Sequence, residues 1–169
     1  MTRENPFSSP TICSLKKYAE KEVSYEKLMF TDYPYINWVY NNLSYFRDKH
    51  IVNALVEIGE RPEVFGFCRN CKGIFAKFVC YYRGDFVTSC GRTTNTNFAS
   101  YCQNCTNEYL NRGSKHYNAP IKFSSILNFD TVSDRKVFVE EFKFAIGAPA
   151  RITDISATKY FHDLYESNW

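Results

Sequence analysis

No apolar run in the sequence approaches the roughly 18 residues that a helix needs to cross a bilayer. The first six residues also lack the hydrophobic stretch of a secretory signal. We therefore expect a protein without a membrane partner that stays in a reducing intracellular compartment, cytoplasmic or nuclear. Hydrophobic residues make up 44% and charged residues 23% of the 169, which excludes wholesale disorder and collagen-like or coiled-coil architectures. This length suits one compact domain, or a small core with a metal-stapled insertion.

The sequence also has no phosphate-binding loop, no dinucleotide fingerprint, no HExxH motif and no GxSxG motif. Only three histidines are present, His50, His116 and His162. His50 and His162 fall in predicted helices, where we expect packed or solvated side chains. These absences leave enzymatic activity open but favour a protein without catalytic residues.

Seven cysteines stand out against these absences, and their odd number argues against a disulfide framework in a protein that is not secreted. Cys68 and Cys71 form one CxxC pair, and Cys102 and Cys105 form a second pair after thirty intervening residues. Two residues between paired thiolates let both sulfurs reach one ion about 2.3 Å away. Two such pairs complete a closed tetrahedron, so we predict a structural Zn²⁺ held by these four cysteines.

The two pairs also share their turn chemistry. An aromatic residue precedes each pair, an asparagine precedes each second cysteine, and Gly73 or Asn107 follows two residues later. Gly and Asn readily adopt the left-handed conformation that a tight turn around a metal requires. The pattern over residues 64–112 resembles the zinc-ribbon class, which carries no single activity. An iron–sulfur cluster, a thioredoxin-like redox centre and two unrelated turns with free thiols are the alternatives.

The other three cysteines carry weaker signals. Cys80 lies in an apolar, aromatic stretch and is expected to be a small buried side chain on a strand. Cys90 is a candidate nucleophile with His116 as its base, or an extra metal ligand. Cys13 indicates nothing specific.

The net charge of +3 is unevenly distributed. Residues 61–120 contain eight Lys and Arg against three Asp and Glu, whereas residues 1–60 and 121–169 each carry a net charge of −1. A cationic segment attracts phosphates, so we predict that it binds nucleic acid, DNA or RNA. A zinc ion with four thiolates would contribute −2, and the alternative is that the basic residues only offset this charge. The predicted phosphate contacts are Lys72, Lys77, Arg83 and Arg92.

A looser pattern suggests a nuclease. Asp130, Glu141 and Lys143 match the order of a carboxylate, a second acid and a lysine that can hold Mg²⁺ and activate water when they lie on adjacent strands. This reading requires Glu141 to lie on a strand, whereas the capping signals at Ser133 and Gly147 favour a helix.

The fold class we predict is α+β, with a small helical N-terminal module, a central four-cysteine zinc ribbon of β-hairpins, and C-terminal helices. We expect a flexible tail (1–12), a helical module (13–60), the zinc ribbon (61–115) and a C-terminal α+β segment packing on the same core (116–169). Capping residues, prolines and glycines predict helices over 24–29, 32–40, 44–59, 133–146 and 156–166, with a helical turn over 108–112. Alternation and apolar runs predict strands over 14–19, 64–67, 75–82, 85–88 and 98–101, an extended segment over 121–129, and a hairpin at residues 83–85.

One segment of the helical module resembles a known family. Asp32, Tyr35, Ile36, Trp38 and Val39 match the pattern "D-P-x-Y-L-x-W-L", and residues 17–21 keep the lysines and tyrosine of a preceding "GKYKGK" strand but not its glycines. On these residues, positions 14–42 resemble the small C-terminal module of exodeoxyribonuclease X-type proteins. The resemblance implies an accessory domain of the kind found beside nucleases and helicases, with Lys17, Lys21 and Trp38 at family positions.

Together these patterns predict a non-catalytic zinc-ribbon protein that binds nucleic acid through its basic, metal-bearing segment. The first alternative is a zinc-stapled adaptor or inhibitor that binds another protein. The second alternative is a Mg²⁺-dependent nuclease.

Overall fold

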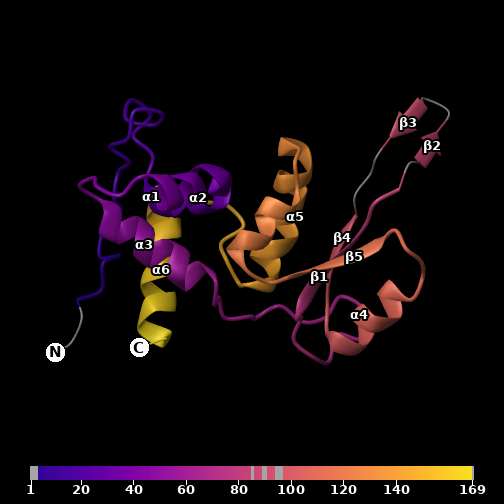
Figure 1. The fold of residues 1–169 in the computed structure, drawn as a ribbon. Helices are drawn as coiled ribbons and strands as arrows, with labels where there is room; N and C mark the ends of the chain where they lie inside the picture. The colour runs from indigo at the N-terminus through magenta and orange to yellow at the C-terminus, as the bar shows by residue number, and fades with distance from the viewer. Residues whose placement is uncertain (1–3, 85, 89–90, 94–96, 169) are drawn as a thin grey trace. The chain divides into compact units, whose positions relative to one another are not determined.

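The computed structural model of the protein describes residues 4–84, 86–88, 91–93 and 97–168, with side chains described outside 85–96 (Figure 1). The chain forms two compact units. Unit 1 comprises residues up to 63, residues 122–128 and residues from 149 onward, and unit 2 comprises residues 64–121 and 129–148. Helices lie at both ends of the chain, and the paired cysteines lie in its central region with a small antiparallel sheet, which confirms the predicted fold class. No helix in the described ranges is both long and apolar enough to cross a membrane.

Unit 1 is helical (Figure 1), and α1, α2 and α6 begin where side chains cap them. Ser24 accepts a hydrogen bond from the Lys27 N–H at the start of α1 (Tyr25–Thr31). Asp32 caps α2 (Tyr33–Asn42), which has a proline in its first turn, and Thr153 caps α6 (Asp154–Ser167) with a reciprocal capping box. The expected helices in these regions are therefore present.

The core of unit 1 is aromatic. Phe30 packs edge-on against Phe123 at 5.1 Å between ring centroids and also contacts Phe161 at 5.8 Å. Residues 4–12, expected to form a loose tail, supply Phe7, which is 1% exposed and packs against Phe161 and Tyr165. Aromatic side chains bury large areas, so these contacts tie the N-terminal segment to α6.

Three expectations for unit 1 are wrong. Residues 14–19 form turns in which the Tyr18 and Ala19 N–H groups both bond to the Leu15 carbonyl, not a strand. The helix expected from residue 44 begins later, as α3 (Lys49–Gly59), and the Asp48 carboxylate before it accepts bonds from Ser14 and Arg47 instead of capping it. The segment expected to be extended over 121–129 contains a 3₁₀ helix, η1 (Phe123–Asn128), whose spacing buries two side chains three residues apart.

Unit 2 is built on a three-stranded antiparallel sheet in the order β4-β1-β5. The central strand β1 (Phe78–Tyr82) pairs with β4 (Phe98–Tyr101) and β5 (His116–Pro120), in a register that places Val79 opposite Ser100 and Ala119. Val79, Cys80 and Tyr81 are all buried, as expected for a central strand covered on both faces. Phe98 and Tyr101 are three residues apart on β4, so their side chains point to opposite faces of the sheet. Phe98 packs against Phe138 of α5 (Val132–Ala145), and Tyr101 packs against Tyr109 of α4 (Gln103–Leu110). The two helices therefore cover opposite faces.

The expected hairpin around residues 83–85 is wrong in its pairing. Strand β2 (Phe86–Thr88) pairs with β3 (Gly91–Thr93) in a separate two-stranded ladder, not with β1. This small ladder extends away from the three-stranded sheet (Figure 1). Because both edges of β1 are occupied by strands that return from farther along the chain, it has no edge left for β2. The expected strand over 64–67 is reduced to a single bridge between Phe67 and Phe75.

Candidate metal centre

The first cysteine pair lies in a tight loop closed by the Phe67–Phe75 bridge. The Cys68 N–H donates to the Ile74 carbonyl at 2.7 Å, and the Lys72 N–H donates to the Cys68 carbonyl at 3.0 Å. The sequence suggested Gly73 for the left-handed position, but Lys72 occupies it with φ = 57°. This backbone conformation is strained for a residue other than glycine, and the surrounding hydrogen bonds hold Lys72 in it.

The second pair lies where β4 leads into α4. Cys102 is the N-cap residue of the helix and Cys105 lies in its first turn, with the Thr106 N–H bonded to the Cys102 carbonyl at 2.9 Å. Residues three apart in a helix share one face, so both sulfurs point to the same side. The helical turn expected only from residue 108 thus begins five residues earlier, at Gln103.

Two backbone hydrogen bonds bring the pairs together. The Arg69 N–H donates to the Ser100 carbonyl, and the Lys77 N–H donates to the Tyr101 carbonyl, each at 2.8 Å. These bonds hold both ends of the first loop against the last residues of β4, directly before Cys102. The strand pairing of unit 2 therefore positions two loops that lie thirty residues apart in the sequence.

The four sulfurs fit one tetrahedral ion. Their Sγ atoms all lie within 4.8 Å of one another, and those of Cys71 and Cys102 are 3.9 Å apart. A tetrahedron of thiolates around Zn²⁺ has edges of about 3.8 Å. Cys68, Cys102 and Cys105 are buried, and Cys71 is exposed. In the part of the chain that the structure describes, this is the one cluster of three or more His, Cys, Asp or Glu side chains with this geometry.

The surroundings stabilise the thiolate form of Cys68 but oppose that of Cys105. Burial opposes ionisation of Cys68, but backbone N–H groups of Cys102, Cys71 and Asn70 donate toward its sulfur and lower the pKa of this thiol to about 6. Asn70 Nδ2 also donates to Cys105 Sγ at 3.4 Å, yet burial and the neighbouring cysteines raise the pKa of Cys105 to about 11. Each thiolate opposes ionisation of the next, and a bound dication would remove that repulsion.

A second layer of contacts, which the sequence did not indicate, fixes residues 67–75 to α5; we call these residues around the first cysteine pair the metal loop. The Arg69 guanidinium donates through Nε and Nη2 to the two carboxylate oxygens of Glu141, each at 3.1 Å. Glu141 Oε1 also accepts from the Ser100 N–H at 2.8 Å. The guanidinium lies over the Phe144 ring, 3.4 Å from its centroid. Arg69 and Glu141 are 72 residues apart, so no local pattern could have found this bidentate ion pair, which we call the Arg69–Glu141 fork.

This fork overturns the geometry that a nuclease site would need. Glu141 lies in α5, not on a strand, and its carboxylate is already bonded to Arg69 and Ser100. Lys143 is buried and pairs with Glu140 at 2.8 Å, and Asp130 is exposed. The three residues therefore do not form the strand-borne carboxylate pair with a lysine that the sequence pattern suggested.

Two of the remaining cysteines, Cys13 and Cys80, lie outside the cluster. Cys80 is buried on β1, and its thiol donates to Thr106 Oγ1 at 3.5 Å. Cys13 is buried in unit 1. His116, on β5, packs against Tyr82 and Tyr109. Cys90 lies outside the described residues, so its suggested pairing with His116 is not addressed.

The predicted phosphate contacts lie at different places on unit 2. Lys72 and Lys77 are exposed at the metal loop and just after it. Arg83 is exposed after β1, with its guanidinium 5.4–5.8 Å from the centroids of Tyr81, Tyr117 and Phe129. The side chain of Arg92 lies outside the described residues. The structure thus groups Lys72 with Lys77 along one segment and places Arg83 at the far end of β1.

The residues that carry the module resemblance form an aromatic row in unit 1. Tyr35 packs against Tyr18 at 5.1 Å and is stacked on Trp38 at 6.3 Å between centroids, and Trp38 is 50% exposed. Lys17 lies 4.6 Å from the Tyr35 centroid and pairs with Asp32 at 2.6 Å, and Lys21 lies 5.1 Å from the Tyr18 centroid. Asp32 neutralises Lys17, whereas Lys21 is exposed and forms no ion pair among the described residues, so one free positive charge lies beside the row.

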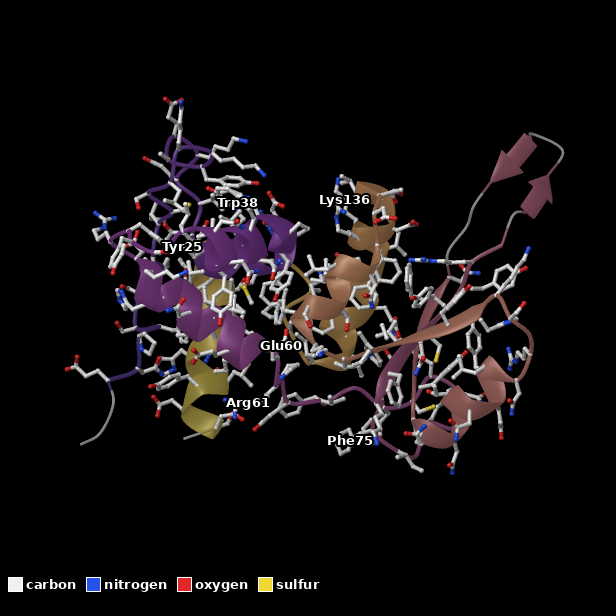
Figure 2. The ribbon with its side chains drawn as sticks, in the orientation of Figure 1. Tyr25, Trp38, Glu60, Arg61, Phe75 and Lys136 are labelled. Atoms are coloured by element: carbon white, nitrogen blue, oxygen red, sulfur yellow. The ribbon has the colours of Figure 1, made fainter. Side chains whose placement is uncertain are left out.

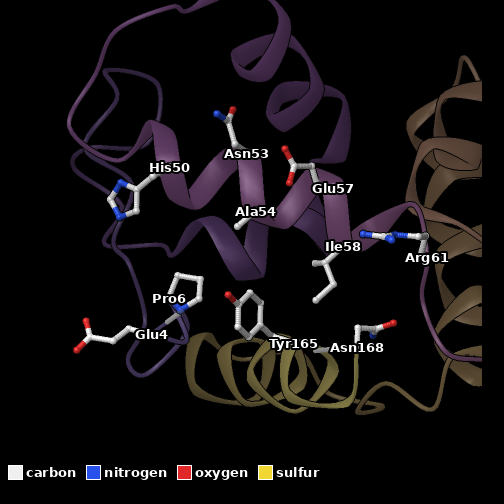
Figure 3. A pocket seen from close by; sticks show the side chains of 10 residues that line it. All are labelled: Glu4, Pro6, His50, Asn53, Ala54, Glu57, Ile58, Arg61, Tyr165 and Asn168. Atoms are coloured by element: carbon white, nitrogen blue, oxygen red, sulfur yellow. The ribbon is translucent and has the colours of Figure 1, made fainter. Parts of the chain in front are cut away.

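Unit 1 also contains a pocket between α3, α6 and residues 4–6 (Figure 3). Pro6, Ile58 and Tyr165 line it together with polar residues, but Asn53 and Glu57 point away from Tyr165 (Figure 3). Its polar groups do not converge on one point, which a binding site for a small molecule requires.

Comparisons with protein-family models, with curated protein sequences and with solved structures found no match for this chain. The four-cysteine arrangement is compatible with a zinc ribbon, although its second pair lies at the start of a helix. What the protein does therefore has to be argued from the centre and the surface around it.

Proposed function

We propose that the four cysteines hold one structural Zn²⁺, and that unit 2 uses the surface around this centre to bind nucleic acid without catalysis. Four thiolate ligands close the coordination sphere, so the ion has no open position for activating water. The sulfurs lie as close together as ligands of a single ion do. An iron–sulfur cluster would place bridging atoms between them and hold the thiolates farther apart.

The observation that carries nucleic-acid binding is the charge of the chain around the first cysteine pair. Residues 64–84 contain Arg69, Lys72, Lys77 and Arg83 and no Asp or Glu. Arg69 is bonded to Glu141, but among the described residues neither Lys72 nor Lys77 forms an ion pair. Two exposed, unpaired ammonium groups on one segment attract phosphates and release the counterions that surround them.

The charge of unit 2 as a whole supports the same proposal. It contains ten Lys and Arg against six Asp and Glu, and the zinc–thiolate centre would lower this surplus by two. Two of the six carboxylates, Glu140 and Glu141, are paired with cations of their own unit. The net positive charge that remains is small, so we expect moderate affinity with a clear dependence on salt.

Metal analysis and nucleic-acid binding on one preparation test this proposal. We expect one zinc per chain, lost in Cys68→Ala and retained in Cys13→Ala. The protein should retard DNA or RNA in a gel shift, and the logarithm of affinity should fall linearly with the logarithm of salt concentration. Lys72→Ala and Lys77→Ala should each reduce that slope by about 0.7 to 0.9, whereas Lys159→Ala, in unit 1, should not.

Two results would contradict the proposal separately. A protein that contains no metal and keeps its fold in chelator would remove the zinc centre. A zinc-loaded protein that shifts no nucleic acid at about 50 mM salt, where phosphate contacts are strong, would remove the binding function.

A further inference from the structure

A pair of stacked phenylalanines forms the stem of the metal loop. Phe67 and Phe75 lie opposite each other across an antiparallel bridge, which places their side chains on one face. Their rings are 4.8 Å apart between centroids and only 13° from parallel. Hydrogen bonds between the two sides, from Cys68 N–H to the Ile74 carbonyl and from Ala76 N–H to the Gly66 carbonyl, flank the bridge and hold this pair in place.

The ring pair is exposed at the surface of unit 2. Phe67 is 50% and Phe75 is 52% exposed, and Figure 2 shows Phe75 at the periphery of the unit, beyond the sheet. Phe65 and Ile74, close by in the sequence, are exposed as well, and exposed apolar side chains that group together mark interaction sites. The loop between the two stacked phenylalanines contains the cysteine pair, so a bound metal would fix the orientation of both rings.

Cations flank the rings along the same chain. Burial alternates over Phe75, Ala76 and Lys77, with the alanine 4% exposed, which places Phe75 and Lys77 on one side of the extended segment. Lys72 lies in the loop between the two phenylalanines, where its positive φ and the bond from its N–H to Cys68 set its direction. Neither ammonium group forms an ion pair within the described ranges, so both are available to an anion.

We propose that the Phe67–Phe75 pair stacks on unpaired bases of a single-stranded nucleic acid, whose phosphates are bound by Lys72 and Lys77. This inference rests on the proposed function and narrows it to single strands. Every base has a π face that stacks on an aromatic ring, so such a site tolerates any sequence. In a duplex those faces are covered by neighbouring base pairs and are not available to the rings.

An apolar segment of a partner protein is the competing occupant, because Phe65 and Ile74 are also exposed nearby. Charge favours the nucleic acid. Residues 64–84 contribute cations and no carboxylate, and charged side chains are depleted from the centres of protein interfaces. Parallel rings on a segment with two lysines that form no ion pair within the described ranges combine the two features, stacking and phosphate attraction, by which single strands are bound.

Fluorescence anisotropy with a labelled oligothymidine of 12 nucleotides, and with a 12-base-pair duplex, tests the inference on the zinc-loaded full chain. The single strand should bind more tightly than the duplex. Phe67→Leu and Phe75→Leu keep an apolar side chain but remove the π face, and each should weaken single-strand binding about tenfold. Duplex binding should change less than twofold in these variants. The matched control is Tyr45→Ala, which removes a fully exposed ring from unit 1 and should change neither affinity.

Zinc content of one per chain in each variant confirms that the loop is intact. If the leucine variants bind the single strand as tightly as the parent, and the duplex binds equally well, the stacking inference is wrong. The proposed function then stands provided that Lys72→Ala and Lys77→Ala still weaken binding and reduce its salt dependence. Leucine variants that keep full binding where Phe67→Ala and Phe75→Ala lose it would show an apolar docking surface instead, which also overturns the inference.

Discussion

Glu26 is a carboxylate without exposed surface, on the first turn of α1 in unit 1. Both of its oxygens lie within hydrogen-bond distance of the Thr11 N–H, at 3.3 and 3.2 Å. Burial raises the pKa of Glu26 from 4.5 to about 7, and the negative charge of Asp154 adds to the rise against the donation from Thr11. The side chain therefore binds a proton in the folded protein at pH values where the unfolded chain has released it.

The sign of the resulting pH dependence follows from linkage. Below about pH 4.5 the group is protonated in both states, and above about pH 7 it is ionised in both states. Between these values only the folded state holds the proton, so the free energy of unfolding should fall as the pH rises, by up to about 3 kcal/mol. Urea denaturation of the parent and of Glu26→Gln at pH 4.5 to 7.5 measures this.

In Glu26→Gln the free energy of unfolding should decrease much less over this pH range, since glutamine has no proton to release. Glu57→Gln, on the exposed side of α3, should retain the slope of the parent. The carboxyls of Asp32, Asp48 and Asp154 have lowered pKa values, so their contributions are lost only as the pH drops below about 4, outside this window. The Cys68 thiol has a lowered pKa and adds stability as the pH rises, so the difference in stability between the parent and Glu26→Gln isolates the contribution of Glu26. A difference that stays constant from pH 4.5 to 7 would contradict the assignment.

Two elements of unit 2 are joined by one ion pair. The metal loop and α5 are held together by the Arg69–Glu141 fork, with the Ser100 N–H of β4 as a third member. The Glu141 carboxylate is largely buried, with 12% of its side chain exposed, whereas Arg69 is 46% exposed. Water can replace Glu141 as a hydrogen-bond partner of Arg69, because Arg69 is more exposed. The backbone N–H of Ser100 therefore depends more on Glu141 for a hydrogen-bond acceptor.

Truncation of Glu141 should cost more than its neutralisation. Glu141→Gln keeps an oxygen for the Ser100 N–H and should lower the free energy of unfolding by about 1 kcal/mol. Glu141→Ala leaves that N–H without an acceptor and should cost about 2 to 3 kcal/mol. Lys136→Gln, exposed on the same helix and labelled in Figure 2, should change stability by less than about 0.5 kcal/mol. Equal effects of the two Glu141 variants would show that the bond to Ser100 contributes little.

Local sequence signals predicted where the helices begin, but they did not predict which strands pair. Ser24, Asp32 and Thr153 cap helices near the predicted positions because a cap bonds to a backbone group two or three residues away. The predicted β1–β2 hairpin failed because turn residues at 83–85 say nothing about β4 and β5, which occupy both edges of β1. Lys72 takes the left-handed position in place of Gly73 because the loop is closed by bonds to residues beyond it.

At the scale of the whole molecule, metal dependence should divide along the two units. All four clustered cysteines belong to unit 2, whose helix α4 is only eight residues long and has no side-chain cap. A helix this short is marginal by itself, and we therefore expect its first turn to rely on packing and on the metal that we propose. Unit 1 has its own aromatic core, with Phe123 and Phe161 fully buried.

Hydrogen exchange after zinc removal tests this division. In chelator, peptides from residues 64–121 should lose protection, whereas peptides covering α1, α3 and α6 should keep theirs. Cys68→Ala should reproduce the loss without chelator, and Cys13→Ala, in unit 1, should not. Uniform loss of protection along the whole chain would mean that the two units do not fold independently.

Sequence alone determined the four cysteines of the candidate metal centre, because paired thiolates two residues apart are a local requirement of a bound ion, and the repeated spacing could be read directly. It also located the cationic segment, since charge is a property of composition. Only the tertiary structure decided that Phe67 and Phe75 stack in the open beside Lys72 and Lys77, and that Glu141 is bonded to Arg69 across 72 residues. Exposure and long-range bonds depend on which strands pair and which faces the helices cover, and no local pattern of residues carries that information.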